Sequence, residues 1–374
     1  MKIFLVCNSL GGGGAERVHV NLANGFAQRG HDVYLIADVN QPASYPVDKK
    51  VHILPLCPKS DNKLVKWAKS ISMLRKNIKQ YRPDVVIGNM HLCSLISRVA
   101  SIGFHVPVVL TIHNALEHKE YHYSMKYKIW DRFAPFIYSA TTVLTKADAI
   151  VMKDKYHHHK RVFVMPNPLT FTPVTVMPGG GLFNGESMIQ KEKVILAAGR
   201  LDNWRYKGWD LLIQAAKELR PLLLQENWII CVAGGGTERT QLFLETLRHD
   251  AGVEDCLQFI GYRKDMKDLF QKASIFFLSS RSEGLPMVLI EAMSQGCAPV
   301  ACDNIGRTSE IITNDFEGLL YRTADVKGMV KQLSIMIQDE KRRAIVQRSA
   351  IKRSHNYLID NVMEKWVRLL EDVL

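Results

Sequence analysis

The sequence predicts an α/β protein with two doubly wound domains, and three observations lead to this prediction. The chain has 374 residues, which suits about two domains that each bury their own core. Short apolar runs rich in β-branched residues alternate with longer amphipathic stretches, as in βαβ units on a parallel sheet. Residues 172–192 contain prolines and glycines without hydrophobic periodicity, and they divide this alternation into two series.

The first series predicts a domain over residues 1–170. It begins with a strand at 2–7, a helix at 15–29 and a second strand at 31–37. Later apolar runs predict further strands at 84–88, 107–112, 140–145 and 161–165. We expect residues 171–192 to form a linker and a loop.

The second series predicts another domain over residues 193–355. Its apolar runs predict strands at 193–198, 228–233, 257–260, 274–278, 298–301 and 318–321. Residues 326–374 are predicted to be consecutive helices, and the last of them, at 356–374, can pack back on the first domain. Both domains are therefore Rossmann-like, and ligands bind such sheets beyond the carboxyl ends of the strands. We expect the two domains to face a cleft that holds the functional site.

Composition favours an ordinary globular protein. Hydrophobic residues make up 47% and charged residues 23% of the chain, which differs from the composition of disordered proteins. No run approaches the roughly 18 apolar residues of a membrane-spanning helix, and the apolar start at residues 1–7 is too short for a signal peptide. Seven scattered cysteines without a Cys-x-x-Cys pair speak against a disulfide framework or a zinc ribbon. We expect a cytoplasmic protein with reduced thiols.

The positive charge lies in the first half of the chain. The formal net charge is +12, and residues 1–170 contain 23 Lys and Arg against 11 Asp and Glu. Residues 171–374 contain 26 of each sign. Such a one-sided basic surface indicates an anionic partner, which could be nucleic acid, acidic lipid or a phosphorylated substrate.

Four consecutive glycines, at residues 11–14, separate the first predicted strand from the helix that follows. Glycines permit close approach of a ligand, and the free N–H groups and dipole of a helix start attract phosphate. The dinucleotide-binding fingerprint is not met, because Glu16 occupies the position of its third glycine. A flexible turn without a ligand remains the alternative.

Two basic residues follow the first strand of the second domain. Arg200 ends that strand, and Lys207 precedes a predicted helix. The planar fork of Arg and the point charge of Lys both suit a diphosphate. The alternative is a solvated basic face.

Two carboxylates, Glu283 and Glu291, lie in the stretch 279–292 (SSRSEGLPMVLIEA) after a predicted strand. They could accept hydrogen bonds from vicinal hydroxyls on two different sugars. In the alternative, Glu283 caps the next helix and Glu291 is solvated.

A helix is expected to start near Pro286, because proline has no N–H to leave unpaired at a first helical turn. The backbone N–H groups from Gly284 through Leu285 to Val288 would then be available to an oxyanion.

Metal sites find little support in the sequence, and we expect neither a metal nor a cofactor. No His-Glu-x-x-His motif is present, and Asp315 and Glu317 lie in a turn-like stretch. The consecutive histidines at 157–159 cannot all face one ion, so a solvated loop is the simpler interpretation. His113 and His118 are five residues apart, which does not place them on one helical face.

These stretches together resemble the retaining glycosyltransferases of family 4, which have the two-domain GT-B fold. The resemblance covers nearly the whole chain. The matching stretches are GGGGAERVHVNLANGFAQRGHDV from residue 11, TIHN at 111–114, MPNPL at 165–169, GRL and KGWDLL from 199, VAGGGTE from 232, FIGYRKDMKDLFQKA from 259, the Glu283/Glu291 pair, and SEII and EGLL within 309–320.

The resemblance implies a role for each matched residue. Glu291 would hold the ribose hydroxyls of the nucleotide, whereas Glu283 and the adjacent backbone would hold hydroxyls of the donor sugar. The expected catalytic residues are His113, Arg200, Lys207 and Glu283. The expected donor-binding residues are Gly13, Gly14, Arg200, Lys207, Tyr262, Arg263, Glu283, Gly284, Leu285, Val288 and Glu291.

Within these sets, Arg200 and Lys207 would neutralise the diphosphate, and Gly14 with its helix start would close from the first domain. The backbone near Tyr262 and Arg263 would contact the base. His113 would reach the donor sugar from the acceptor side.

The chain departs from the family pattern at two places. Six residues separate Arg200 from Lys207 where the family usually has four or five, so Arg205 could share or replace the role of Lys207. We prefer Lys207 because the residues that follow it match the family. Ile305 and Gly306 replace two glycines, which puts one backbone contact to phosphate in doubt.

The expected reaction moves a hexose or N-acetylhexosamine from a nucleotide sugar, most commonly a UDP-sugar in this family, to a lipid-linked or polysaccharide acceptor. Positive groups stabilise the leaving diphosphate where its charge develops, so no metal is required. Retention in the family is commonly explained by front-face attack, in which the leaving phosphate oxygen takes the acceptor proton. We therefore assign no protein nucleophile.

Two other functions fit the sequence less well than a transferase does. A sugar-nucleotide epimerase on the same fold would need acid and base groups around the sugar, and the Glu283/Glu291 spacing speaks against it. A basic nucleic-acid-binding protein would need a recognition element, and the sequence contains none that we recognise.

Residues 63–81 predict a basic amphipathic helix. Apolar side chains recur at helical spacing with lysines between them, and residues 120–133 add aromatic and basic side chains. Such a face can rest on anionic lipid or pack in the core, and both interpretations stay open here. The resemblance favours a peripheral location on the inner face of the cytoplasmic membrane, because many relatives extend sugars on polyprenyl-diphosphate or lipopolysaccharide carriers.

Overall fold

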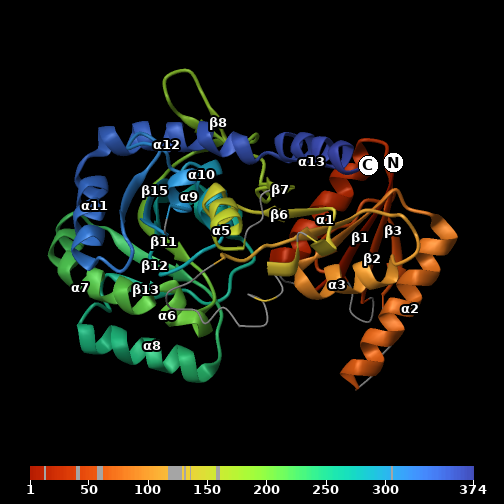
Figure 1. The fold of residues 1–374 in the computed structure, drawn as a ribbon. Coiled ribbons are helices and arrows are strands. Elements are labelled where there is room, and N and C mark those ends of the chain that lie inside the picture. The colour runs from red at the N-terminus through yellow and green to blue at the C-terminus, as the bar shows by residue number, and fades with distance from the viewer. Residues whose placement is uncertain are drawn as a thin grey trace. The chain divides into compact units, whose positions relative to one another are not determined.

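The computed structural model describes residues 1–11, 14–38, 43–56, 62–116, 129, 132–134, 136–156, 161–304 and 306–374. The chain forms two compact units (Figure 1). The first unit contains Met1–Pro168 and Ile359–Leu374, and the second contains Leu169–Leu358. The chain therefore passes from one unit to the other twice.

The first unit is built on a parallel sheet of seven strands in the order β3-β2-β1-β4-β5-β6-β7. The strands are β1 (Lys2–Ser9), β2 (Asp32–Asp38), β3 (His52–Pro55), β4 (Val85–Asn89), β5 (Val108–Thr111), β6 (Ala140–Val143) and β7 (Val162–Val164). The helices are α1 (Gly14–Gln28), α2 (Lys63–Tyr81), α3 (Met90–Ala100), α5 (Lys146–Tyr156) and α13 (Ile359–Val373). This order is the doubly wound order of Rossmann domains, as the sequence predicted.

The second unit repeats this order in a parallel sheet of six strands, β13-β12-β11-β14-β15-β16. The strands are β11 (Glu192–Ala198), β12 (Ile229–Ala233), β13 (Leu257–Phe259), β14 (Ala273–Leu278), β15 (Ala298–Asp303) and β16 (Leu319–Arg322). The helices are α6 (Trp204–Lys207), α7 (Trp209–Gln225), α8 (Glu238–Ala251), α9 (Met266–Lys272), α10 (Met287–Ser294), α11 (Val326–Gln338) and α12 (Glu340–Ser354), with 3-10 turns η1 (Leu201–Asn203), η2 (Thr308–Glu310) and η3 (His355–Tyr357).

The stretch expected to be a linker, residues 171–192, is instead part of the second unit. It forms a small antiparallel sheet, β10-β9-β8, from β8 (Thr175–Val176), β9 (Leu182–Phe183) and β10 (Met188–Ile189). Leu182 is buried against Val174 and Ile351, which fixes the sheet on the unit. Strands of two residues are too short to produce a periodic pattern, which explains why the sequence did not reveal them.

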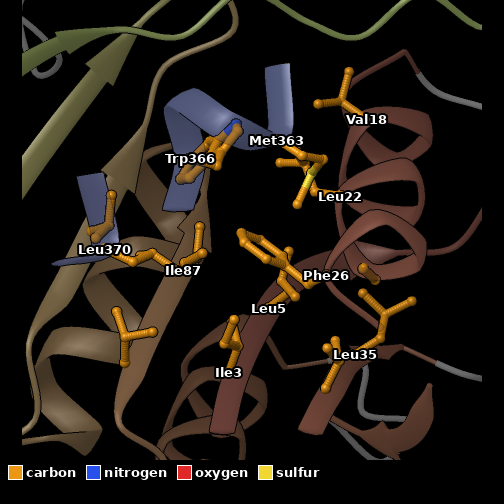
Figure 2. Packing of buried hydrophobic residues seen from close by; sticks show 14 of the residues in the cluster. Ile3, Leu5, Val18, Leu22, Phe26, Leu35, Ile87, Met363, Trp366 and Leu370 are labelled. Carbon is orange, nitrogen blue, oxygen red and sulfur yellow. The ribbon is translucent and has the colours of Figure 1, made fainter. Parts of the chain in front are cut away.

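Helix α13 completes the hydrophobic core of the first unit. Met363, Trp366 and Leu370 are buried on its inner face together with Phe26 of α1 and Leu5 of β1 (Figure 2). The ring centres of Phe26 and Trp366 are 6.3 Å apart in an edge-to-face arrangement. The last helix therefore belongs to the same core as the first strand.

Close packing of α13 against α1 depends on a glycine in α1. A Cβ atom on Gly25 would lie 2.7 Å from the sulfur of Met363, which is closer than atoms can pack. Arg29, which follows the last residue of α1, also donates a 2.5 Å hydrogen bond to Asp360 of α13. Among the described residues, no helix is both long and apolar enough to cross a bilayer.

Replacing Trp366 by Ala is expected to lower the free energy of unfolding of the first unit by about 3–5 kcal/mol, because a large buried side chain leaves a cavity. Urea unfolding followed by circular dichroism measures the loss. Glu364 lies on the exposed side of the same helix, so Glu364→Ala should change the stability by less than about 0.5 kcal/mol. Equal effects of the two substitutions would contradict the assignment of α13 to this core.

Candidate functional site

The second unit contains a pocket of about 420 Å³ at the carboxyl ends of its strands. Its lining comes from segments that follow four neighbouring strands of the sheet. These are Arg200 and Lys207 after β11, Gly234 and Gly235 after β12, Tyr262 and Arg263 after β13, and Val288 and Glu291 after β14. The site therefore lies where a doubly wound sheet binds its ligands.

Glycines allow the backbone segments around the pocket to approach closely. A Cβ atom on Gly234 would lie 1.9 Å from the carbonyl oxygen of Gly199, so only glycine fits there. Gly208 has a φ of 69°, and a Cβ atom on it would lie 2.2 Å from the carbonyl oxygen of Ser279. Both contacts bring the end of β11 against its neighbouring strands, and they place Lys207 at the pocket.

Lys207 and Glu283 are joined by an ion pair. Lys207 Nζ lies 2.6 Å from Glu283 Oε1, and both side chains are largely buried. The same carboxylate oxygen accepts a 2.7 Å hydrogen bond from Ser280 Oγ. Two residues that the sequence assigned to different parts of a ligand therefore lie side by side.

Glu291 lies on α10 and lines the pocket. Its side chain is buried, and Oε1 accepts a 2.5 Å hydrogen bond from Thr170 Oγ1. Thr170 follows the MPNPL stretch in the chain. Glu291 is therefore held by a hydroxyl group and is not a solvated carboxylate.

Lys191 connects α9 and α10, which both contribute residues to the pocket lining. Its ammonium group donates hydrogen bonds of 2.9 Å to the carbonyl oxygens of Phe270, Ala273 and Gln295. Phe270 belongs to α9, and Gln295 follows the last residue of α10. The three N–H groups of the ammonium therefore each meet a carbonyl acceptor, which compensates for the burial of the charge. Burial nevertheless lowers the pKa of Lys191 to about 8.

The other predicted cations and aromatic residues lie at the mouth of the pocket. Arg200 is exposed, and Tyr262 has 73% of its surface exposed. Arg263 makes a bidentate ion pair with Asp265 at 2.8 and 2.5 Å. Arg205 is exposed and is not part of the lining, which favours Lys207 over it at this site.

Helix α10 begins one residue later than expected, at Met287, with Pro286 as its N-cap. The segment before it contains Gly284 and Leu285, which are not part of the pocket lining, whereas Val288 is. The N–H groups of a first helical turn have no acceptor within the helix. Val288 in the first turn of α10 lines the same pocket as three cationic residues, Arg200, Lys207 and Arg263.

The remaining predicted residues lie in the first unit. Gly14 is the exposed first residue of α1, and a Cβ atom on it would meet nothing within 4 Å. Gly13 lies outside the described residues, and so does Ile305, which belongs to the chain of the second unit. His113 follows β5 and hydrogen-bonds through Nδ1 to Asn167 Oδ1 at 3.1 Å.

His113 lies beside a second histidine, His19 of α1, with ring centres 5.6 Å apart. Burial lowers the pKa of His113 to about 4. Burial, together with the charge that His113 would carry, lowers the pKa of His19 to about 3. Both imidazoles are therefore neutral at physiological pH.

No group of three or more His, Cys, Asp or Glu is placed to hold a metal ion in the part of the chain that the structure describes. The histidines at 118 and 157–159 lie outside that part. The six cysteines within it are all free thiols.

Sequence reasoning missed several residues of the site. Thr170, Ser280 and Lys191 are common residue types at positions without a recognisable spacing, so no local pattern marks them. The VAGGGTE stretch matches the family, but the sequence alone does not show why residue 234 must be glycine. The reason is the close approach of Gly199, which follows a different strand.

Two family models match the chain. The model described as Glycosyltransferase Family 4 matches residues 12–170, and the model described as Glycosyl transferases group 1 matches residues 183–353. The two matches follow one another along the chain and include the predicted site residues of both units.

Curated relatives match along most of their length. A Campylobacter jejuni enzyme named GalNAc-alpha-(1->4)-GalNAc-alpha-(1->3)-diNAcBac-PP-undecaprenol alpha-1,4-N-acetyl-D-galactosaminyltransferase is 28% identical over 100% of this chain and 99% of its own. An Escherichia coli enzyme named UDP-Gal:alpha-D-GlcNAc-diphosphoundecaprenol alpha-1,3-galactosyltransferase is 25% identical over 88% of this chain and 85% of its own.

Solved structures share the fold of this chain. The sucrose-phosphate synthase of Thermosynechococcus elongatus superposes with a TM-score of 0.81 at 15% identity, covering 100% of this chain and 98% of its own.

Acid is expected to destabilise the first unit. His19 and His113 stay neutral in the folded state down to pKa values of about 3 and 4, whereas the unfolded chain takes up these protons near the usual value of 6.5. Since the unfolded state then binds more protons, the free energy of unfolding falls as the pH drops from about 6.5 toward 4, by up to roughly 1.4 kcal/mol per pH unit for each histidine.

Urea unfolding at about pH 7.5 and about pH 5 measures this loss. His19→Leu should make the loss smaller, whereas His105→Leu, at an exposed position, should not change it. The interpretation fails if the loss is the same in all three proteins.

Proposed function

Because the chain belongs to the family 4 glycosyltransferases and has their GT-B fold, we propose that it transfers a hexose or N-acetylhexosamine from a UDP-sugar to a glycan carried on a lipid diphosphate. The chain is a glycosyltransferase by its family models, and this assignment favours transfer over epimerisation or nucleic-acid binding. The observation that carries the donor site is the pocket, which places Arg200, Lys207 and Glu291 together at four strand ends.

The diphosphate of the donor would bind between Arg200 and Lys207. A negative charge develops on the leaving nucleoside diphosphate, and two cations beside it stabilise that charge without a metal ion. The backbone N–H groups at the start of α10 add neutral donors on the same side, near Gly284 and Val288. We therefore propose a reaction that is independent of metal.

Two carboxylates would hold hydroxyl groups: Glu291, which lines the pocket, and Glu283, which is paired with the lining residue Lys207. Glu291, now bonded to Thr170, would accept hydrogen bonds from the ribose. Glu283, now bonded to Ser280 and Lys207, would accept one from the donor sugar once the diphosphate engages Lys207.

The exposed ring of Tyr262 and the neighbouring Arg263 would lie against the base. The named substrates of the relatives support UDP, because the Escherichia coli enzyme is named for UDP-Gal. For the first unit, Gly13, Gly14 and His113 stay the proposed contacts with the substrate. Since Nε2 of His113 is buried, its contact with a sugar requires the groups covering it to move.

Retention of configuration is the stereochemical part of the proposal. Both relatives are named for α-linked products, and UDP-galactose carries its sugar in α linkage, so an α product is the retained one. The pocket offers cations and hydrogen-bond acceptors, and Glu283 is engaged by Lys207 and Ser280. We assign no protein nucleophile, and the leaving phosphate oxygen would take the acceptor proton.

The acceptor side would rest on the membrane through α2. The apolar stripe of this helix divides into two parts: Leu74 and Ile78 are buried in the core, whereas Leu64, Val65 and Trp67 are exposed by 73%, 41% and 41%. Core packing therefore explains only the second half of the stripe. Lysines flank the exposed half, and such a surface suits anionic lipid.

Nucleotide binding tests the donor site. UDP at about a hundred times its dissociation constant should stabilise the protein by roughly 2.7 kcal/mol, with or without EDTA, and GDP and ADP should do so less. Glu291→Gln should remove most of this stabilisation, because the amide accepts fewer hydrogen bonds from ribose. Glu218→Gln, at an exposed position on α7, is the control. Stabilisation that needs a divalent metal, or that survives Glu291→Gln unchanged, would overturn the assignment.

Vesicle binding tests the membrane surface. Trp67→Glu should weaken binding to vesicles containing phosphatidylglycerol by roughly tenfold, since an apolar ring is lost from the lipid contact. Ile102→Glu changes another exposed apolar residue of the first unit and should have little effect. Equal loss in both variants, or equal binding to neutral vesicles, would rule out α2 as the docking surface.

A further inference from the structure

His19 has no role in the function proposed above, yet it is completely buried beside a residue that has one. It lies on α1, and none of its surface is exposed. Its ring lies edge-to-face with that of His113, with an angle of 76° between the ring planes. A polar ring in this position needs an explanation, because burying a polar group without a partner is costly.

The hydrogen bonds of the two rings fix which nitrogen carries the proton. His19 Nδ1 lies 3.3 Å from the carbonyl oxygen of Ala15, one turn earlier in α1. A carbonyl oxygen can only accept, so the proton of the neutral ring is on Nδ1. His113 Nδ1 lies 3.1 Å from Asn167 Oδ1, which is also an acceptor, so the proton of this ring is on Nδ1 as well. Each ring therefore has a lone pair on Nε2.

Both Nε2 atoms are buried and accept no hydrogen bond from any protein group in the described ranges. Two adjacent acceptors without a donor cannot satisfy one another. They suit a group that brings its own proton, such as the hydroxyl of a sugar. Of the two residues, only His113 has some surface exposed, so His19 acts through His113.

The ring of His113 has few other restraints in the described residues. Its backbone N–H donates to Met90 Sδ at 3.3 Å, and its side chain hydrogen-bonds to Asn167 alone. This single hydrogen bond fixes the position of Nδ1 but leaves the ring plane free to rotate. The edge-to-face contact with His19, whose own ring is tied to Ala15, restrains the plane.

We propose that His19 is a positioning residue that holds the plane of the His113 ring, so that the ring keeps its hydrogen bond to Asn167 and presents the Nε2 lone pair to a substrate hydroxyl. This inference rests on the proposed contact of His113 with a sugar. The first histidine orients the second through this edge-to-face ring contact.

The experiment uses the full chain labelled with ¹⁵N in histidine. Long-range ¹H–¹⁵N spectra of the wild type should show His113 in a single tautomer with an unprotonated Nε2. His19→Leu removes the ring contact, so the His113 ring can turn out of its hydrogen bond with Asn167, and His113 should then show the averaged nitrogen shifts of two tautomers. His19→Phe keeps a ring for the edge-to-face contact and should retain most of the wild-type pattern.

The same proteins are assayed for release of UDP from UDP-N-acetylgalactosamine. We expect His19→Leu to lower kcat roughly tenfold with little change in KM, since misplacement of a contacting group affects the reacting geometry, and His19→Phe to restore most of the rate. Val20→Ala, at a buried position on the same helix, controls for general loosening of α1.

An unchanged His113 spectrum in His19→Leu overturns the proposal, and so does the same spectral change in Val20→Ala. If the spectra change as expected while the wild type releases UDP from no nucleotide sugar, the positioning of His113 stands and the proposed function fails. If the spectra change but kcat does not, His19 orients a ring that the reaction does not use, and the proposal is wrong.

Discussion

The position of β11 between β12 and β14 is the constraint on which the pocket depends. Strands β12 and β13 are added on one side of β11, and the chain then crosses over to place β14 on the other side of β11. Right-handed crossovers place the helices of the two halves on opposite faces. The loops after β11 and β14 therefore diverge and leave a crevice, which Gly199, Gly208 and Gly234 narrow by bringing backbone against backbone.

The two units treat their buried polar groups in different ways. In the second unit, charges compensate one another, as in the pair of Lys207 with Glu283. When a ligand binds Lys207, the ammonium group exchanges one buried partner for another. Binding therefore does not include the full desolvation free energy of burying an isolated charge. In the first unit, His19 and His113 avoid charge altogether and leave lone pairs for a donor.

Much of the fold could be predicted because parallel strands buried on both faces are continuous apolar runs. The runs at 228–233 and 274–278 predicted β12 and β14 to within one residue. The short strand β3 was missed, since three of its four residues are exposed and give no apolar run. Strands β8 to β10 were missed because each has only two residues, too few for a periodic pattern.

The site was only partly predictable. Residues that belong to a matched stretch could be located: Lys207 by the KGWDLL stretch that it begins, and Glu291 by its distance from Glu283 along the chain. The contacts between Lys207 and Glu283, or between Thr170 and Glu291, join positions 76 and 121 residues apart. These contacts depend on the order of the strands in the sheet and on how closely backbone segments approach one another. Neither can be predicted from the local sequence.

The placement of α13 has a consequence for how the protein forms during synthesis. Strand β1 is made before the second unit, but Trp366 and Leu370, which cover it, are made after the whole second unit. Until then Leu5 and Phe26 lack part of their cover, and a nascent chain would expose apolar surface that chaperones bind. The second unit, whose segments are contiguous from Leu169 to Leu358, can complete its own core first, so folding need not follow the order in which the chain is made.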